Sequence, residues 1–275
     1  TTDNLKVRAT SPTFVAVEES KYTSNEHDNF LYQIWHWGYN AIDYSNNIIR
    51  GIEQYGQYAE PIKRQHIAEA KFIRAYVYFQ LLAMFGDQAL LGNDAGDGVV
   101  LTLEPYSGYN PKDSKGRSTN SECWQQIIKD LTEALPDLPD AVPAASSRVR
   151  ATKSVAQSLL SRVYLYKASY KGNQEELKLA ADYAHAVLQN TAYRFSSLSS
   201  EYSNNLFPSN EFSQAGSYPD PTTYSTELIF FEPSRIYAKN YPNGMAYYRK
   251  VSFYIPKAAI NYYEANDVRR TNLIK

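Results

Sequence analysis

Apolar side chains recur at helical spacing through residues 28–193, whereas polar and turn-forming residues dominate much of the remaining chain. Within residues 68–87, AEAKFIRAYVYFQLLAMFGD, two apolar faces begin at Phe72 and Ile73 and repeat every three or four residues. A helix with one apolar stripe faces one neighbour, so this helix needs neighbours on both sides. We therefore expect a central helix of the fold, ended by Gly86.

The same periodicity predicts five consecutive helices, followed by a shorter one near the end of the chain. Asp28 and Thr152 are suitable N-caps, and Pro61 suits the first turn of the second helix. The five helices are expected at 28–58, about 61–85, from near 118–121 to 135, 152–170 and 174–190, and the shorter one at 257–270. Four aromatic residues on these helical stripes are expected in the core: Trp124, Tyr164, Tyr166 and Tyr183.

Two of the predicted helices, 152–170 and 174–190, are separated by a tight turn and together have the span of a tetratricopeptide unit. Small residues such as Ala156 and Ala180 would let them approach closely. The second and third helices are expected to form a similar pair, with a long loop inserted between them in which Val99–Leu103 is an extended segment. The pattern predicts a mainly α fold of stacked helical pairs.

After Tyr193 the pattern changes to turn formers with interspersed aromatic residues. We expect one domain over residues 1–275, in which 28–193 form a helical scaffold and 194–256 form an irregular, loop-rich lobe laid against it. A short strand-like run is expected at residues 228–231.

The overall charge favours a neutral or locally matched partner. Lys and Arg number 28 against 29 Asp and Glu, so no overall field would attract nucleic acid or an anionic membrane. No apolar run is long enough to span a bilayer, and the first ten residues do not resemble a signal peptide. We expect that any signal or lipid-bearing terminus has been removed or lies outside this sequence. Tyrosine, with 25 residues, is unusually frequent and suits wet contact surfaces.

No arrangement of residues typical of catalysis or of metal or cofactor binding stands out. Cys123, the single cysteine, is interpreted as a buried bystander thiol rather than a nucleophile. None of the four histidines has a second His or a Cys at metal-ligand spacing. Residues 92–98, GNDAGDG, could hold a calcium ion, but they lack the ligand spacing of an EF-hand and favour a solvated turn. Glu69 and Asp43 are interpreted as helix-surface carboxylates.

Aromatic residues outside the helical stripes carry the more specific hypothesis. A flat ring can cover the C–H face of a sugar while neighbouring amides and guanidinium groups bind its hydroxyls. Trp37 is a candidate because it lies off the stripe of Trp35, Tyr39 and Ile42, although packing against a neighbouring helix is an equally simple role. The segment IYAKNYPNGMAYYRK offers the richest mixture of rings and polar donors: Tyr237, Asn240, Tyr241, Asn243, Tyr247, Tyr248 and Arg249.

Four segments resemble, in the correct order, the SusD/RagB family of Bacteroidetes surface lipoproteins. They are AEAKFIRAYVYFQLLAMFGD, RATKSVAQSLLSRVYLY, STELIFFEP and INYYEANDVRR. Trp35, Tyr39, Ile42 and Asn46 also fit the early helix of that family, so the resemblance covers most of the chain from about residue 30. Two features depart from the family: the lipobox cysteine is absent, and the sequence stops just after DVRR. We therefore expect the N-terminal part of the family fold.

The resemblance implies a tetratricopeptide-like scaffold with an irregular binding lobe. It also implies attachment to the outer membrane at the cell surface through an N-terminal lipid, and a partnership with a SusC-like, TonB-dependent transporter. The expected function is non-enzymatic capture of an oligosaccharide and its delivery to that transporter. A peptide-capturing RagB-type importer, a tetratricopeptide-like protein–protein adaptor and, third, a hydrolase are alternatives.

The resemblance also associates a second region with binding, in which Tyr22, Asn25 and Asn29 are the candidate residues. A third aromatic loop, with Tyr106 and Tyr109, could bind ligand or meet the transporter. No cofactor and no nucleic acid are expected.

Overall fold

The computed structural model describes residues 6–7, 25–108, 114–142, 149–193, 229–230 and 253–254, with side chains of α2 described from residue 31 onward. The chain divides into two compact units. One comprises Thr1–Gln33, Ala144–Val149 and Arg194–Lys275, and the other comprises Ile34–Pro143 and Arg150–Tyr193. The predicted helix at 257–270 and nearly all of the predicted lobe at 194–256 lie outside the described residues.

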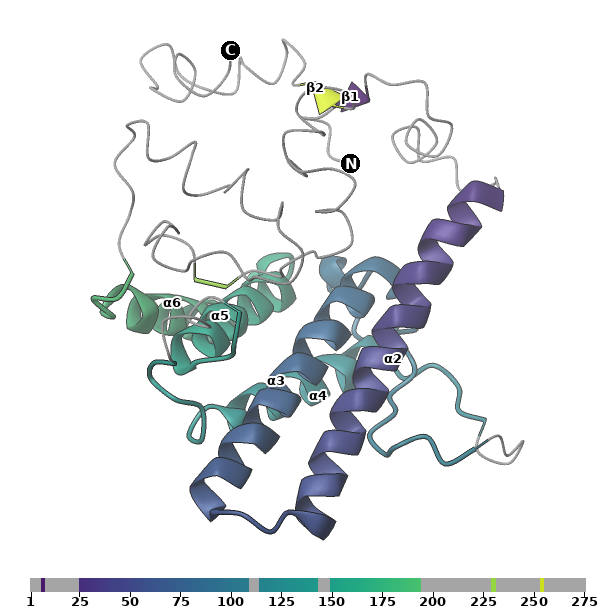
Figure 1. The fold of residues 1–275 in the computed structure, drawn as a ribbon. Helices are drawn as coiled ribbons and strands as arrows, with labels where there is room; N and C mark the ends of the chain where they lie inside the picture. The colour runs from purple at the N-terminus through teal and green to yellow at the C-terminus, as the bar shows by residue number, and fades with distance from the viewer. Residues whose placement is uncertain are drawn as a thin grey trace. The chain divides into compact units, whose positions relative to one another are not determined.

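The described residues are mainly helical, as expected (Figure 1). The five principal helices are α2 (Asn25–Tyr55), α3 (Glu60–Phe85), α4 (Asn120–Ala134), α5 (Lys153–Ser169) and α6 (Gln174–Leu188). A 3-10 turn, η1 (Ala89–Leu91), follows α3. The short strands β1 (Lys6–Val7) and β2 (Phe253–Tyr254) pair antiparallel, with Lys6 opposite Tyr254. All five predicted scaffold helices are therefore confirmed.

The helix ends follow the local sequence, with one correction. Thr152 caps α5, as predicted, and its side chain accepts a hydrogen bond from the backbone N–H of Val155. Gly86 ends α3, where a Cβ would lie only 2.6 Å from the carbonyl oxygen of Leu82. Asp28, however, is not a cap, because α2 begins three residues earlier at Asn25.

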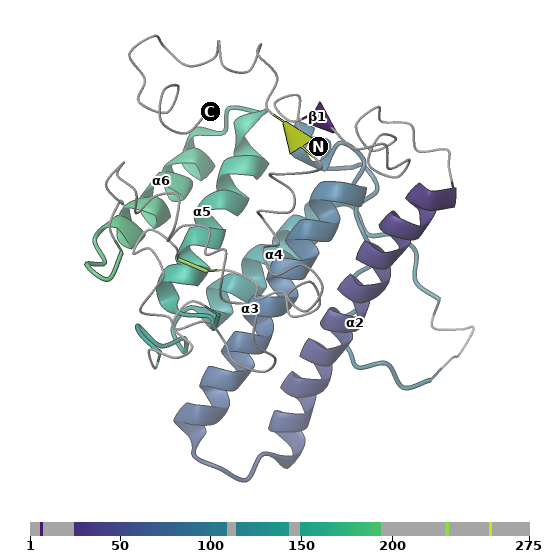
Figure 2. The same cartoon turned by 45° about the horizontal axis from the view of Figure 1, so that its top comes forward.

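Helices pack in pairs, α3 with α4 and α5 with α6. Ala180 of α6 is buried, and its carbonyl accepts a hydrogen bond of 2.8 Å from the Ser161 hydroxyl of α5, so the predicted close approach is confirmed. Helix α2 also packs closely against α3: a Cβ built at Gly38 of α2 would lie 3.0 Å from the Leu81 side chain of α3. Figure 2 shows α3 running beside α2 along most of its length. The apolar helix noted in the sequence is thus an inner helix with neighbours on both sides.

The predicted extended segment after α3 packs against the helices without joining a sheet. Val99 is fully buried, and no residue from 99 to 108 belongs to a strand. The Tyr39 hydroxyl donates to the Val100 carbonyl at 2.8 Å, and the Tyr78 hydroxyl donates to the Thr102 carbonyl at 2.9 Å. Tyrosine side chains of α2 and α3 therefore supply hydrogen bonds that a neighbouring strand would otherwise make.

Most of the predicted core aromatics are less buried than expected. Trp124 is completely buried beside Phe79, as predicted. Tyr164 and Tyr183 are half-buried and stack with ring centroids 6.0 Å apart, and Tyr166 is 41% exposed. The prediction that Tyr166 lies in the core was wrong. The apolar face of a helix can extend to the edge of its packing interface, where one side of a tyrosine ring packs and the other side contacts solvent.

Candidate functional site

Three aromatic rings and one isoleucine lie in a row along the solvent-exposed face of α2. They are Trp37, Tyr44, Ile48 and Tyr55, with exposed fractions of 61%, 66%, 47% and 77%. The opposite face of α2 supplies the core contacts: Trp35 meets Phe85 edge-on with ring centroids 5.1 Å apart, and Ile42 is fully buried. Trp37, the ring that lies off the core stripe, is thus exposed. We call the four residues the α2 row.

A shallow, mainly apolar groove of about 390 Å³ runs beside the α2 row, between α2 and α3. Polar groups in the groove already have partners within the protein. His66 Nδ1 lies 3.2 Å from the Tyr58 hydroxyl, and Glu69 forms an ion pair with Arg150. The groove is lined by Ala41, Tyr44, Ser45, Ile48, His66, Glu69, Ala70 and Ile73. It therefore offers apolar surface with little uncompensated charge.

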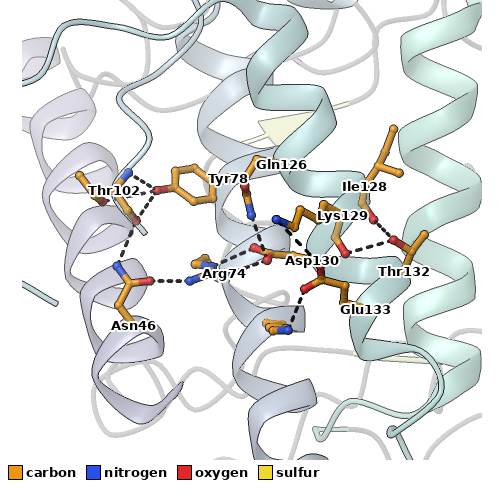
Figure 3. Close-up of polar contacts among 11 residues, drawn as sticks. Asn46, Arg74, Tyr78, Thr102, Gln126, Ile128, Lys129, Asp130, Thr132 and Glu133 are labelled. Atoms are coloured by element: carbon orange, nitrogen blue, oxygen red, sulfur yellow. Dashed lines mark hydrogen bonds and ion pairs between the residues drawn. The ribbon is translucent and has the colours of Figure 1, made fainter. Parts of the chain in front are cut away.

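A buried polar network joins α2, α3 and α4 to one another (Figure 3). Arg74 of α3 donates two hydrogen bonds to the Asp130 carboxylate of α4, at 2.8 and 2.7 Å. A third bond of 2.8 Å runs from Arg74 to the amide oxygen of Asn46 on α2, and the amide nitrogen of Asn46 donates to the carbonyls of Thr102 and Glu104. The network thus links three helices and the extended segment through hydrogen bonds of buried side chains.

Electrostatics in this network favour the ionised pair. Burial by itself lowers the pKa of Arg74, but the hydrogen bonds and negative charge of Asp130 outweigh burial and raise that pKa. Gln126 donates a further bond of 3.0 Å to Asp130, so the carboxylate accepts three hydrogen bonds. A buried charge pair with these partners is a fixed structural element.

Two residues considered for catalysis or metal binding, Cys123 and Asp94, make structural contacts. Burial raises the pKa of the Cys123 thiol, which lies 3.4 Å from the Val99 backbone nitrogen, so the protonated thiol is favoured. In the 92–98 loop, Asp94 forms an ion pair of 2.6 Å with Lys171. Among the described residues, no group of three or more His, Cys, Asp or Glu side chains is placed to hold a metal ion. Likewise, none of the described helices has the length and apolar character needed to cross a membrane.

The structure brings few of the predicted site residues together. Trp37 lies on α2, and Asn25 and Asn29 lie in its first turns, where their side chains are outside the described part of the chain. Tyr106 is exposed, and its backbone N–H donates to Asp43 at 2.6 Å. The remaining candidates lie outside the described residues: Tyr22, Tyr109, Tyr237, Asn240, Tyr241, Asn243, Tyr247, Tyr248 and Arg249.

Sequence reasoning missed the other two rings of the α2 row. Tyr44 follows Trp37 by seven residues, and Tyr55 follows it by eighteen, which are close to whole numbers of helical turns. A search for ring spacing around Trp37 would have found them.

Comparisons of the sequence with known proteins all find SusD-like proteins. A sequence profile for a SusD-like family, described as "Starch-binding associating with outer membrane", matches residues 2–165. A "SusD-like protein" of Bacteroides ovatus is 29% identical over 170 residues, which are 60% of this chain and 28% of the relative. The chain thus spans less than a third of the length of that relative.

Solved structures show the same fold. A SusD superfamily protein of Bacteroides thetaiotaomicron matches 96% of this chain and 55% of its own, at 21% identity and a TM-score of 0.68. A "SusD-like carbohydrate binding protein" of Bacteroides vulgatus matches 97% of this chain and 52% of its own, at 18% identity and a TM-score of 0.74. At these identities the likeness establishes the helical, tetratricopeptide-like fold alone.

Proposed function

Because the chain belongs to the SusD-like family, whose description is starch-binding and association with the outer membrane, we propose that it captures oligosaccharides at the cell surface without altering them. The match over residues 2–165 is the observation that carries this proposal. The finer steps are an N-terminal lipid anchor at the outer membrane and delivery of the glycan to a SusC-like, TonB-dependent transporter.

Capture requires a preformed surface that can cover sugar rings. The network around Arg74 and Asp130 holds α2, α3 and α4 rigid, so exposed rings on α2 lose little conformational entropy when ligand binds. Trp37 is the candidate ring on this scaffold. We propose that the loop-rich segment 194–256, whose aromatic stretch includes Tyr241, also contributes ligand-binding residues. Tyr22, Asn25 and Asn29 are the further candidates.

The test is a binding panel of neutral oligosaccharides and peptides, measured by calorimetry on the wild-type chain, Trp37→Ala and Tyr241→Ala. We expect glycan binding to the wild type and a roughly three- to tenfold loss of affinity in at least one variant, because each aromatic contact contributes about 0.5–1.5 kcal/mol. Unchanged affinity in both variants would remove these site residues from the proposal.

The same panel separates the alternatives. Binding of peptides in preference to glycans would favour a RagB-type importer, and release of shorter sugars during incubation would favour a hydrolase. Failure to bind any glycan would overturn the proposed function. Delivery predicts in addition that the protein copurifies with a TonB-dependent transporter from solubilised outer membranes.

A further inference from the structure

The α2 row is straight and long. Seven residues of an α-helix make nearly two turns and eighteen make five, so Trp37, Tyr44 and Tyr55 lie almost on one line parallel to the helix axis. The distance along that axis is about 10 Å from the first ring to the second and about 27 Å from the first to the third. Ile48 fills the interval after Tyr44 with a further exposed apolar side chain.

A second row, of amides, runs beside the first. Asn40, Asn47 and Gln54 follow one another at intervals of seven residues. Asn40 and Asn47 each lie three residues after a ring of the α2 row, so amide and ring are neighbours on the helix surface. Gln54 immediately precedes Tyr55 and lies about 100° from it around the helix axis. We call these three residues the amide row.

Hydrogen bonds within α2 already hold two of the amide nitrogens. Asn40 Nδ2 lies 3.0 Å from His36 Nε2, and Asn47 Nδ2 donates to the Asp43 carbonyl at 2.9 Å and to its carboxylate at 3.0 Å. These bonds orient both side chains, and each retains its amide oxygen as an acceptor for a ligand hydroxyl.

Neither row contains a charged residue. Two charged side chains of the same stretch of α2 are engaged by the segment after α3: Arg50 donates to Glu104 at 2.7 Å, and Asp43 accepts from the Tyr106 backbone. A helical projection at 100° per residue places Asp43 and Arg50 more than a quarter turn from the ring positions. The ring positions thus carry no charge, and the two charges nearest to the amide row, Asp43 and Arg50, are already engaged by the Tyr106 backbone and by Glu104. This arrangement matches an uncharged, hydroxyl-rich ligand.

The groove between α2 and α3 adds concavity to this face. Tyr44 and Ile48 belong both to the α2 row and to the groove lining, so the centre of the row forms one wall of a hollow of about 390 Å³. A volume of this size suits part of a small ligand and gives the surface a preferred seat near its middle.

We propose that the α2 row and the amide row form a binding site for an extended, neutral, β-1,4-linked oligosaccharide lying parallel to α2. Sugar faces stack on Trp37, Tyr44 and Tyr55, and hydroxyls along one edge of the chain bond the amide row. The intervals correspond to roughly two sugar units between the first rings and three between the next. A straight line of rings fits an extended chain, whereas an α-1,4-linked chain coils away from it. This inference rests on the proposed function and specifies one site for it.

The test compares cellohexaose with cellotriose and with maltohexaose by calorimetry on the 275-residue chain. We expect cellohexaose to bind at least tenfold more tightly than the other two, because only an extended chain of about six units reaches all three rings. Tyr44→Ala and Tyr55→Ala should each weaken cellohexaose binding roughly three- to tenfold. Tyr170→Ala, which removes a ring that is 69% exposed elsewhere on the helical unit, should leave it unchanged.

Thermal melting and light scattering accompany each variant. All of the replaced rings are exposed, so unchanged melting temperatures are expected. Glycan binding that is indifferent to Tyr44→Ala and Tyr55→Ala, or equal affinity for maltohexaose, overturns this site while the proposed function stands. A wild-type dimer that becomes a monomer in Tyr44→Ala also overturns it, because the row would then be an interface between copies. Absence of all glycan binding overturns the proposed function itself.

Discussion

Arg74 and Asp130 place two full charges inside the protein, between α3 and α4. Both are nearly inaccessible, and their bidentate contact leaves few donors and acceptors without a partner. A buried pair of this kind adds little stability compared with a well-packed apolar pair, but removing one partner strands the other charge. Its structural value here is that Arg74 also reaches Asn46, so one side chain sets the positions of both neighbouring helices.

This argument predicts a large effect for Asp130→Ala. The variant leaves the Arg74 guanidinium buried without a counter-charge, and we expect the free energy of unfolding to fall by about 3–5 kcal/mol. The measurement is reversible urea denaturation followed by circular dichroism.

Asp137→Ala is the matched control for Asp130→Ala. Asp137 pairs with the exposed Arg64 at 3.1 Å, and an exposed ion pair contributes at most about 1 kcal/mol. Similar small losses in both variants would show that water or neighbouring groups solvate Arg74 when Asp130 is removed.

Tyr78 gives a prediction for alkaline pH. Its ring is fully buried, and its hydroxyl accepts a hydrogen bond of 2.8 Å from the Thr102 backbone while donating to the Thr102 carbonyl. Burial raises the pKa of Tyr78 above its ordinary value, and burial likewise raises the pKa of Tyr39. Both hydroxyls therefore stay protonated in the folded protein at a pH where they ionise in the unfolded chain.

The sign of the pH effect follows from these raised pKa values. Unfolded tyrosine ionises near pH 10, so the folded state binds more protons above that pH and stability falls as the pH rises further. The contribution is complete below about pH 10. We expect Tyr78→Phe to be less stable at neutral pH by about 1–3 kcal/mol, because Thr102 loses its partner, but to lose stability less steeply above pH 10. Urea denaturation from neutral to alkaline pH measures the free energy of unfolding of the wild type and the variant. If both lose stability equally steeply above pH 10, the raised pKa of Tyr78 does not cause the loss.

Among single elements, the N-terminal ends of helices could be predicted from local sequence. Thr119 caps α4 with a reciprocal arrangement in which its hydroxyl accepts from the Glu122 backbone and the Glu122 carboxylate accepts from the Thr119 backbone at 2.7 Å. These residues are three apart, so the signal is contained in the local sequence. The predicted start near residues 118–121 was correct for this reason.

Thr119→Ala tests the contribution of this cap. We expect the free energy of unfolding to fall by about 1 kcal/mol, because α4 loses a side-chain acceptor for its first turn. Thr132→Ala makes the same substitution within α4, where the exposed hydroxyl bonds back to the Ile128 and Lys129 carbonyls, and should be close to neutral. Chemical denaturation measures the free energy of unfolding of both variants. An equal decrease in both would mean that the Thr119 cap does not stabilise α4.

At the scale of the whole molecule, helical pairing followed from the sequence only in outline. The tight turn between α5 and α6 made that pair predictable, and small residues indicated a close contact. The pairing of α3 with α4 was also predicted, although the long insertion between them gives no local signal for how the intervening segment packs. Tyr39, Asn46 and Tyr78 fix that segment through contacts across more than twenty residues of chain.

The candidate site, too, was predictable from the sequence only in part. Trp37 was identifiable from its position off the core stripe of α2, whereas Tyr44 and Tyr55 were passed over although they share its face. Helical spacing places both rings on the face of Trp37. Whether that face is exposed depends on what α3 and the segment after it cover, which spacing along one helix does not tell. The groove beside Tyr44 exists only because α3 lies next to α2.

The sequence by itself determined the helices, most of their ends and the family, since periodicity, caps and motifs act over a few residues. Tertiary structure alone decided that Arg74 meets Asp130 across fifty-six residues, that Tyr166 lies at a rim, and that one face of α2 remains open. Burial and charge pairing are properties of neighbours brought together by packing, and a single chain segment does not contain its neighbours.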